Sequence, residues 1–282
     1  MDLNCLEDVP ETINSSLSSA IGDSYEMLGH LMQREISTAP NPFYLLNQAD
    51  GITEASRSHI CSWICEVAQE FEFSNLTTAF AINYLDRYLT HYSTTQHRLQ
   101  LVALVAILIA SKFQENDGIS MEEAKEIASN VFTVGDIKRM ERDMLGALEW
   151  KLHAVVPIMY IERILDDLDQ THHLSAVCDE IVSLHQATYN QLQFSSSIVA
   201  ISILRIAYDL HGLCSSLLSE YLSKMNLSLN TNECQEQLQL ILPSHLTKKK
   251  KRERSPSPSS VDEDITTITT PHMTEIKRQK SC

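Results

Sequence analysis

The feature that most constrains the fold is a long stretch of chain without residues that break helices. No proline occurs between Phe43 and Val156, and only four glycines lie in that stretch. Proline and glycine are the residues that most often interrupt regular structure. No run of residues there alternates apolar and polar side chains cleanly enough to be a half-buried strand. The stretch therefore predicts a series of helices and no sheet.

The spacing of apolar residues divides this stretch into five helices. From Ile60 to Phe71, apolar residues recur at the three- and four-residue intervals of one helical face. Further helices are expected over 76–91 and about 96–113, after 117–120, and from 133–136 to near Leu148. The third contains LVALVAILIA (101–110) and is apolar nearly all round, so the others must surround it. Its apolar run has about half the length of a membrane span, which indicates a buried core helix.

A second series of helices begins at Pro157. Helices are expected near 158–168, 174–191, 196–211, 214–224 and 231–241, and the third is again the apolar one. Two units that each surround their third helix suggest an internal duplication. The predicted fold class is all-α, with tandem five-helix units and disordered ends. The domains are a disordered segment 1–20, a first unit 21–152 including a short helix at 25–37, a second unit 153–245, and a disordered tail 246–282.

The charge is distributed unevenly along the chain. From Lys248 onward lie nine of the 22 basic and five of the 37 acidic residues, so the tail carries +4 and the remainder −19. An acidic body argues against nucleic-acid binding, because phosphates require Lys and Arg. The seven cysteines are scattered, which favours free thiols in a reducing compartment over a metal site. With no secretory signal and no membrane span expected, a soluble intracellular protein is predicted.

Four segments, in order, resemble successive helices of a cyclin box. They are ASRSHICSWICEVAQEF, AINYLDRYLT, HRLQLVALVAILIASKFQEN and VGDIKRMERDMLGALEWKL. The resemblance is strong over 54–152, and over 155–240 it depends mainly on helix order. It implies the cyclin fold and a regulatory subunit that binds and activates a cyclin-dependent kinase. It implies no catalytic residue, metal or cofactor. Kinase inhibitors are a further class of partner that the resemblance implies.

Two charged residues carry the implied kinase contact. Lys112 follows the apolar helix, where the helix dipole favours a cation, and Glu141 lies on the fifth helix. By position alone, the two could form an ion pair within the chain. The resemblance implies instead that both face the kinase and hydrogen-bond its backbone and regulatory helix. We favour the second interpretation.

Two other sets of residues follow from the same resemblance. Arg57 and Asp86 match a pair that joins the first and second helices of the cyclin box, and a structural role is expected for them. Ile60, Trp63 and Gln100 match part of a shallow patch that docks substrate peptides in many cyclins. Ser56 and His59 stand where that patch has a methionine and an aliphatic residue, so weak docking is expected.

The sequence LNCLE at residues 3–7 places Leu3, Cys5 and Glu7 at alternate positions. Alternate residues share a face on an extended strand and not on a helix. The pattern therefore suits an extended peptide that fills small pockets. L-x-C-x-E ahead of a cyclin box resembles the peptide with which D-type cyclins bind retinoblastoma-family pocket proteins. The expected role is promotion of entry into S phase through phosphorylation of those proteins.

The tail contains two kinds of signal. The basic cluster at Lys248, Lys249, Lys250, Lys251 and Arg252 resembles a nuclear import sequence, which predicts a nuclear protein with a cytoplasmic fraction. Ser255, Ser257 and Thr270 each precede a proline, which is what proline-directed kinases require. Thr270 lies where D-type cyclins place a phosphorylated degradation signal.

Other classes of protein fit the sequence less well. An enzyme is disfavoured because no Gly-rich phosphate loop, His-Glu-x-x-His motif or nucleophile motif is found. A transcription factor of the IIB family also pairs two cyclin-like folds, but it needs a basic DNA-binding face. A transcription-type cyclin remains the other alternative, and the N-terminal peptide argues against it.

Overall fold

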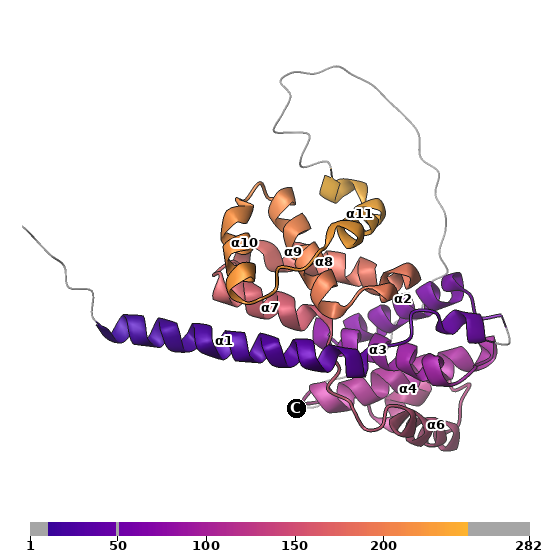
Figure 1. Cartoon of the computed structure of the whole chain (residues 1–282). Coiled ribbons are helices and arrows are strands. Elements are labelled where there is room, and N and C mark those ends of the chain that lie inside the picture. Colours follow the sequence, from indigo (N-terminus) through magenta and orange to yellow (C-terminus); the bar gives the residue numbers. More distant parts are fainter. Residues whose placement is uncertain (1–10, 49–50, 248–282) are drawn as a thin grey trace, which may run out of the picture.

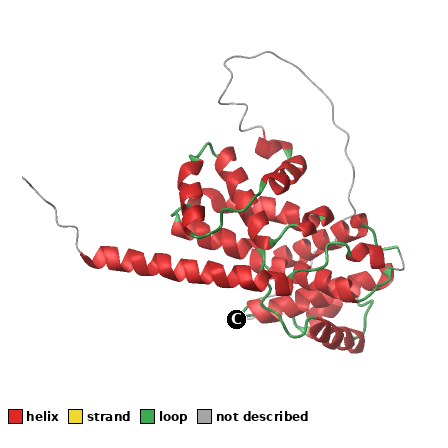
Figure 2. Ribbon diagram, viewed as in Figure 1, coloured by secondary structure: helices red, strands yellow, loops and turns green. Residues whose placement is uncertain are grey.

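The computed structural model describes the backbone of residues 11–48 and 51–247, and the side chains in those ranges from Gly22 onward. Within these ranges the regular structure consists of helices alone (Figure 2). They form two units that lie against each other, with one long helix alongside (Figure 1). The all-α tandem arrangement predicted from the sequence is confirmed.

The first unit surrounds one buried helix. Every residue of α4 from Leu101 to Ser111 is buried, and α4 packs against the other four helices of the unit. The predicted central position of this helix is therefore confirmed. The helices of the unit are α2 (Glu54–Glu70), α3 (Asn75–His91), α4 (Gln96–Gln114), α5 (Met121–Ile127) and α6 (Val134–Ala147).

Side-chain caps explain where three of these helices begin. The Ser74 hydroxyl accepts a hydrogen bond from the Thr77 amide at the start of α3. Ser120 with Glu123, and Thr133 with Asp136, form reciprocal capping boxes at the starts of α5 and α6. Such caps satisfy backbone N–H groups that have no partner within the helix.

The second unit repeats the arrangement around α9. This helix packs against the four others of its unit. The 3-10 helix η2 (Tyr189–Gln193) follows α8, so the helix expected over 174–191 ends earlier than predicted. The helices of the unit are α7 (Pro157–Asp167), α8 (Thr171–Ala187), α9 (Ser196–Leu210), α10 (Ser215–Lys224) and α11 (Asn232–Ile241).

The long helix α1 (Glu11–Thr38) differs from its prediction in two ways. Residues 11–20, expected to be disordered, form its first part, and its N-terminal half extends beyond both units (Figure 1). No proline lies between Pro10 and Pro40, so nothing in the chain interrupts the helix. The sequence predicts that this helix belongs to the first unit, 21–152. In the structure, Leu28 and Leu31 of α1 are buried in the core of the second unit.

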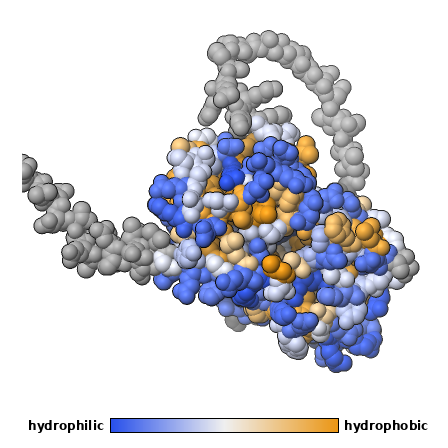
Figure 3. Space-filling model, in the orientation of Figure 1, coloured by the Kyte–Doolittle hydropathy of each residue, from blue (hydrophilic) through white to orange (hydrophobic). Residues whose placement is uncertain are grey.

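Three further properties hold for the described residues. None of their helices combines the length and the apolar character needed to cross a membrane. No group of three or more His, Cys, Asp or Glu side chains is arranged there to hold a metal ion. The five cysteines described as free thiols include Cys61, Cys178 and Cys234, which are buried. Polar residues cover much of the face shown in Figure 3, with smaller apolar patches among them.

Candidate functional site

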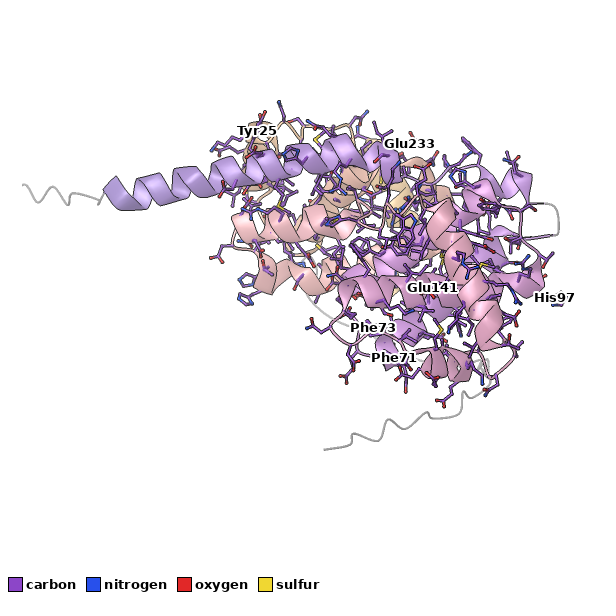
Figure 4. All side chains as sticks on the ribbon, turned by 90° about the horizontal axis from the view of Figure 1, so that it is seen from below. Tyr25, Phe71, Phe73, His97, Glu141 and Glu233 are labelled. Carbon is purple, nitrogen blue, oxygen red and sulfur yellow. The ribbon has the colours of Figure 1, made fainter. Side chains whose placement is uncertain are left out.

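Lys112 and Glu141 form an ion pair at the surface of the first unit. Lys112 lies in the last turn of α4 and Glu141 on α6, which lies beside α4, and Figure 4 labels Glu141. The Lys112 Nζ is 2.7 Å from the Glu141 Oε1, and the two side chains are 41% and 20% exposed. An exposed pair of this kind contributes about 0–1 kcal/mol to stability. Both groups can therefore exchange partners at small cost.

The end of α4 that carries Lys112 is held by the loop that follows it. A Cβ atom at Gly118 would lie 2.9 Å from the Lys112 Cα and N atoms, so only a glycine allows this close approach. The Ser111 hydroxyl accepts a 3.1 Å hydrogen bond from the Ile119 amide. The loop therefore fixes the backbone of Lys112. Sequence reasoning missed the role of Gly118, because a lone glycine in a loop does not reveal its neighbours.

Glu115, just past α4, joins this end of the helix to the start of α3. Its carboxylate accepts 2.9 Å hydrogen bonds from the Ser74 amide and hydroxyl, and a further one from the Thr77 hydroxyl. Burial alone would raise the pKa of Glu115, but these hydrogen bonds outweigh it and lower the pKa. The charged form of Glu115 is thus the one that holds the two helices together.

A pocket with two exposed aromatic residues lies near the C-terminal end of α4. Phe113 is 42% exposed, and Trp150, in the turn after α6, is 72% exposed. Both line a pocket of about 410 Å³ that also includes His153, whose ring lies 6.4 Å from that of Phe113. Arg34 of α1 donates a 3.0 Å hydrogen bond to the His153 carbonyl oxygen. The pocket therefore joins α1, α4 and the segment after α6.

Arg57 and Asp86 form a buried ion pair between α2 and α3. The Arg57 Nε and Nη2 atoms donate to the two carboxylate oxygens of Asp86 at 2.8 and 2.7 Å. The Tyr44 hydroxyl donates a further 2.8 Å hydrogen bond to Asp86. Burial alone would lower the pKa of Arg57, but Asp86 more than compensates and holds this pKa above its usual value. Two-point contact of this kind is the strongest geometry available to an arginine.

The same arginine also contacts the second unit. The Arg57 Nη1 atom donates a 3.0 Å hydrogen bond to the Gln186 carbonyl oxygen at the end of α8. Burial, followed by Asp86, raises the pKa of Tyr44, so its hydroxyl stays protonated and donates. Sequence reasoning singled out Arg57 and Asp86 and missed Tyr44 and Gln186. Neither residue has a local motif that marks it as a partner.

The three residues of the expected substrate-docking patch lie on two neighbouring helices. Ile60 and Trp63 are on α2 and Gln100 is on α4, and these helices pack together. Ile60 is buried in the core of the first unit, Trp63 and Gln100 are half-buried, and His59 is exposed. The surface that these residues offer is consequently small.

The remaining candidate residues lie outside the described residues. These are Leu3, Cys5 and Glu7 near the N-terminus, and the candidate import and phosphorylation residues Lys248, Lys249, Lys250, Lys251, Arg252, Ser255, Ser257 and Thr270.

Comparison with known proteins relates this architecture to cyclins. Residues 26–153 match the family described as "Cyclin, N-terminal domain". Cyclin-A3-3 of Arabidopsis thaliana is 29% identical over 213 residues, which are 73% of this chain and 63% of that protein. G2/mitotic-specific cyclin-2 of Medicago sativa is 30% identical over 160 residues, 57% of this chain and 48% of that protein. The chain thus spans less than two thirds of the length of these relatives.

A solved structure extends the similarity to both units. The crystal structure of a viral cyclin from herpesvirus saimiri aligns with a TM-score of 0.66 and 19% sequence identity. The alignment covers 79% of this chain and 97% of the viral protein, so it includes both five-helix units. At this level of identity the similarity concerns the fold. Residues 26–153 are therefore similar to the N-terminal domain of cyclins, and the chain shares the two-unit fold of the viral cyclin.

Proposed function

We propose that this chain is the non-catalytic regulatory subunit of a cyclin-dependent serine/threonine protein kinase. The observation that carries the proposal is the exposed Lys112–Glu141 pair, within the segment that matches the cyclin N-terminal domain. The pair offers a cation and an anion on a rigid surface at little cost in stability. Lys112 would donate to backbone carbonyls of the kinase, and Glu141 would accept from its backbone amides.

Exposed apolar residues near the end of α4 support the same assignment. Phe113 and Trp150 are exposed aromatic residues near the end of α4, and Ile36 of α1 is also exposed. Aromatic residues are enriched at the centres of protein interfaces and carry much of their binding energy. Exposed aromatic residues and exposed charges are both of the type that a protein partner covers.

Co-purification of the full chain with a panel of cyclin-dependent kinases tests the proposal. The Lys112→Glu/Glu141→Ala variant should lose at least tenfold in kinase binding and in stimulated kinase activity, with unchanged helical circular dichroism. Lys224→Glu is the matched control, because Lys224 forms an equally simple exposed pair with Glu220 on α10. Undiminished kinase binding by the double variant would show that the assigned surface is wrong.

Within this class we propose a D-type cyclin that promotes entry into S phase by directing phosphorylation of retinoblastoma-type pocket proteins. The LNCLE sequence supports this subtype, whereas the relatives named above are A-type and mitotic cyclins. Leu3 and Cys5 would fill adjacent apolar pockets, and the Glu7 carboxylate would accept backbone hydrogen bonds. A short peptide of this kind is expected to bind with a Kd near 1 μM, or about −8 kcal/mol.

Calorimetry with a peptide of residues 1–12 and a retinoblastoma-type pocket domain tests the subtype. Glu7→Lys should weaken binding more than Cys5→Ala, because it removes an acceptor and introduces a cation. Neither change should alter kinase binding by the full chain. If no binding heat appears at about 100 μM pocket domain, the D-type assignment is wrong and the proposal becomes a cyclin of another type.

The tail is proposed to control location and lifetime. The basic cluster at 248–252 would direct the protein to the nucleus, with a fraction in the cytoplasm, and phosphorylated Thr270 would mark it for degradation. Replacing Lys248–Lys251 by alanine should move a fluorescent fusion protein to the cytoplasm.

Thr270→Ala should lengthen the half-life of the protein, and an unchanged half-life would contradict a role of Thr270 in degradation. Ser255 and Ser257 are further candidate phosphorylation sites.

We propose that substrate peptides dock only weakly at Ile60, Trp63 and Gln100, since Ile60 is buried. Replacing Trp63 by alanine should reduce phosphorylation of a docked substrate and leave phosphorylation of a short peptide unchanged.

Kinase inhibitors are a further proposed class of partner for the assembled complex.

A further inference from the structure

A groove at the surface, here called the α11 groove, lies between α11, η2 and the residues before the 3-10 helix η1 (Tyr44–Asn47). Its volume is about 410 Å³, within the range of about 300–1,000 Å³ for binding sites. Two large apolar side chains in its lining are open to solvent, since Leu240 of α11 is 86% exposed and Phe43 is 63% exposed. Exposed apolar side chains that gather around a groove mark a surface that another segment covers.

Contacts between the walls hold the α11 groove together. The Gln193 side-chain amide donates a 3.3 Å hydrogen bond to the Gln237 Oε1 atom, which joins the end of η2 to α11. The Leu45 amide donates a 3.2 Å hydrogen bond to the Tyr189 hydroxyl, which joins η1 to η2. The Tyr189 ring also packs edge-on against Tyr44, with 5.4 Å between the ring centroids. The groove is thus a part of the fold.

The lining of the α11 groove limits the charge of its occupant. Among the described residues, none with a charged side chain lines it. Apolar surface comes from residues such as Leu240 and Ile241, and the polar groups are side-chain amides and hydroxyls, as in Asn190 and Thr188. A charged group placed there would lose water without gaining a counter-ion, which is unfavourable. The lining therefore suits an uncharged segment with aliphatic side chains.

One segment of this chain outside the described residues has that chemistry. Residues 265–273, ITTITTPHM, contain no Asp, Glu, Lys or Arg and include two isoleucines and a methionine. The other uncharged run of the tail, 255–261, contains a single aliphatic residue. Residues 1–10 carry three acidic residues and precede α1, whose N-terminal half extends beyond both units (Figure 1). By composition, 265–273 is the best match to the groove.

The chain leaves the second unit close enough to the α11 groove for this segment to reach it. Leu246 is buried in the core of that unit. Thr247, the last described residue, follows Ile241 of the groove by six positions, so the two lie within about 20 Å of each other. The 17 residues 248–264 can span up to about 60 Å. No other part of the chain has to move for 265–273 to arrive there.

Two physical effects favour docking within the chain. A tethered segment meets its site at an effective concentration of about 1 mM, so weak intrinsic affinity is sufficient. The tail from Lys248 onward carries +4 and the remainder −19, so the two attract each other. We propose that residues 265–273 dock in the α11 groove and cover Thr270, and that a phosphate on Thr270 releases them.

The release follows from charge. A phosphate on Thr270 adds a charge of about −2, and no cation in the lining is available to pair with it. The phosphorylated segment therefore leaves the groove, and the Thr270–Pro271 sequence stays accessible. The release rests on the phosphorylation of Thr270 proposed above, whereas the docking does not.

Photo-crosslinking within the full chain tests the docking. The photoreactive residue p-benzoylphenylalanine, placed at Leu240, should crosslink to residues 265–273 of the same chain, as identified by mass spectrometry. The same photoreactive residue at Leu217, which is 50% exposed on α10, is the control and should give at least tenfold less of this product. A product of doubled mass, a crosslink to residues 1–10, or no crosslink to 265–273 would overturn the proposal.

Variants of the tail leave the described fold unchanged and sharpen the test. Ile265→Asp/Ile268→Asp should lower the crosslink yield at least tenfold, because it places two charges in the uncharged groove. Ile276→Asp is the matched control, since it changes an isoleucine outside the docked segment, and its yield should equal that of the parent. Equal yields from the double variant and the parent would contradict docking through the two isoleucines.

Substitution of Thr270 tests the release. Thr270→Glu should lower the crosslink yield at least fivefold, whereas the uncharged Thr270→Val should retain it. An unchanged yield with Thr270→Glu would overturn the release by charge. The Lys112→Glu/Glu141→Ala variant should crosslink like the parent, so this result does not depend on kinase binding.

Hydrogen exchange of the unlabelled full chain provides a second measurement. The amides of residues 265–273 should exchange at least fivefold more slowly in the parent than in Ile265→Asp/Ile268→Asp. Exchange at the same rate in both proteins would overturn the docking.

Discussion

The Arg57 guanidinium donates a 3.0 Å hydrogen bond to the carbonyl oxygen of Gln186, which is 129 residues further along the chain. The same guanidinium is bound at two points by Asp86. One side chain of the first unit thus joins α2, α3 and the end of α8. The ion pair that stabilises the first unit also helps to set how the second unit packs against it.

Replacing Arg57 by methionine is expected to lower the free energy of unfolding by about 3–5 kcal/mol. The change leaves the Asp86 carboxylate buried with Tyr44 as its donor, and the Gln186 carbonyl without its guanidinium partner. Urea denaturation followed by circular dichroism measures the loss. Arg139→Met is the matched control, since the Arg139–Asp136 pair is exposed and should contribute little to stability. A loss no larger than that of the control would contradict the assigned role.

Gly118→Val is expected to destabilise the chain by about 1–3 kcal/mol, because the new side chain meets the Lys112 backbone. It should also weaken kinase binding by displacing Lys112. Gly146→Ala provides the comparison, since a Cβ there meets nothing within 4 Å and Gly146 lies inside α6. That change should stabilise the chain by about 0.5–1 kcal/mol. Chemical denaturation measures the change in stability of both variants. Equal stabilities would contradict a close approach at Gly118.

The buried His185 predicts a pH-dependent stability. Its pKa in the folded chain is lowered to about 3 by burial and by Arg57, whereas in the unfolded chain the pKa is about 6.5. Between these values the unfolded chain binds the proton and the folded chain does not. The free energy of unfolding therefore falls as pH falls from about 6.5, by at most about 1.4 kcal/mol per pH unit.

The His185→Phe variant isolates this effect. The other titrating groups contribute to both proteins. The free energy of unfolding of the variant minus that of the parent should therefore rise as pH falls below about 6.5, because only the parent loses stability through His185. Urea denaturation at pH 7.5, 6.0 and 5.0 measures the difference. A difference that stays constant over this range would show that His185 titrates alike in the folded and unfolded chains.

The Lys112–Glu141 pair should matter little for stability. Exchanging the two charges, with Lys112→Glu and Glu141→Lys together, is expected to change the free energy of unfolding by less than about 1 kcal/mol, because the pair is exposed. Thermal and urea unfolding check this expectation. A loss of several kcal/mol would mean that the pair stabilises the fold. A loss of kinase binding by charge variants would then no longer identify the pair as a kinase contact.

Local sequence signals determined most of the helices. The apolar spacing from Ile60 to Phe71 predicts α2, and the apolar residues at 101–110 predict the buried α4. The segments 117–120 and 133–136 predict the starts of α5 and α6, where Ser120 and Thr133 are the capping residues. These signals can be read because a helix and its caps depend on residues within about four positions of each other. The family resemblance added Lys112, Glu141, Arg57 and Asp86 as candidates.

The tertiary structure decided which of these parts meet. The packing of α1 on the second unit through Leu28 and the contact of Arg57 with Gln186 have no local signal. The same is true of Gly118 against Lys112 and of the α11 groove. Helical periodicity shows which face of a helix is apolar, but not which other helix covers it. That choice depends on the simultaneous packing of residues more than a hundred positions apart, because the interior must be filled at close to crystal density.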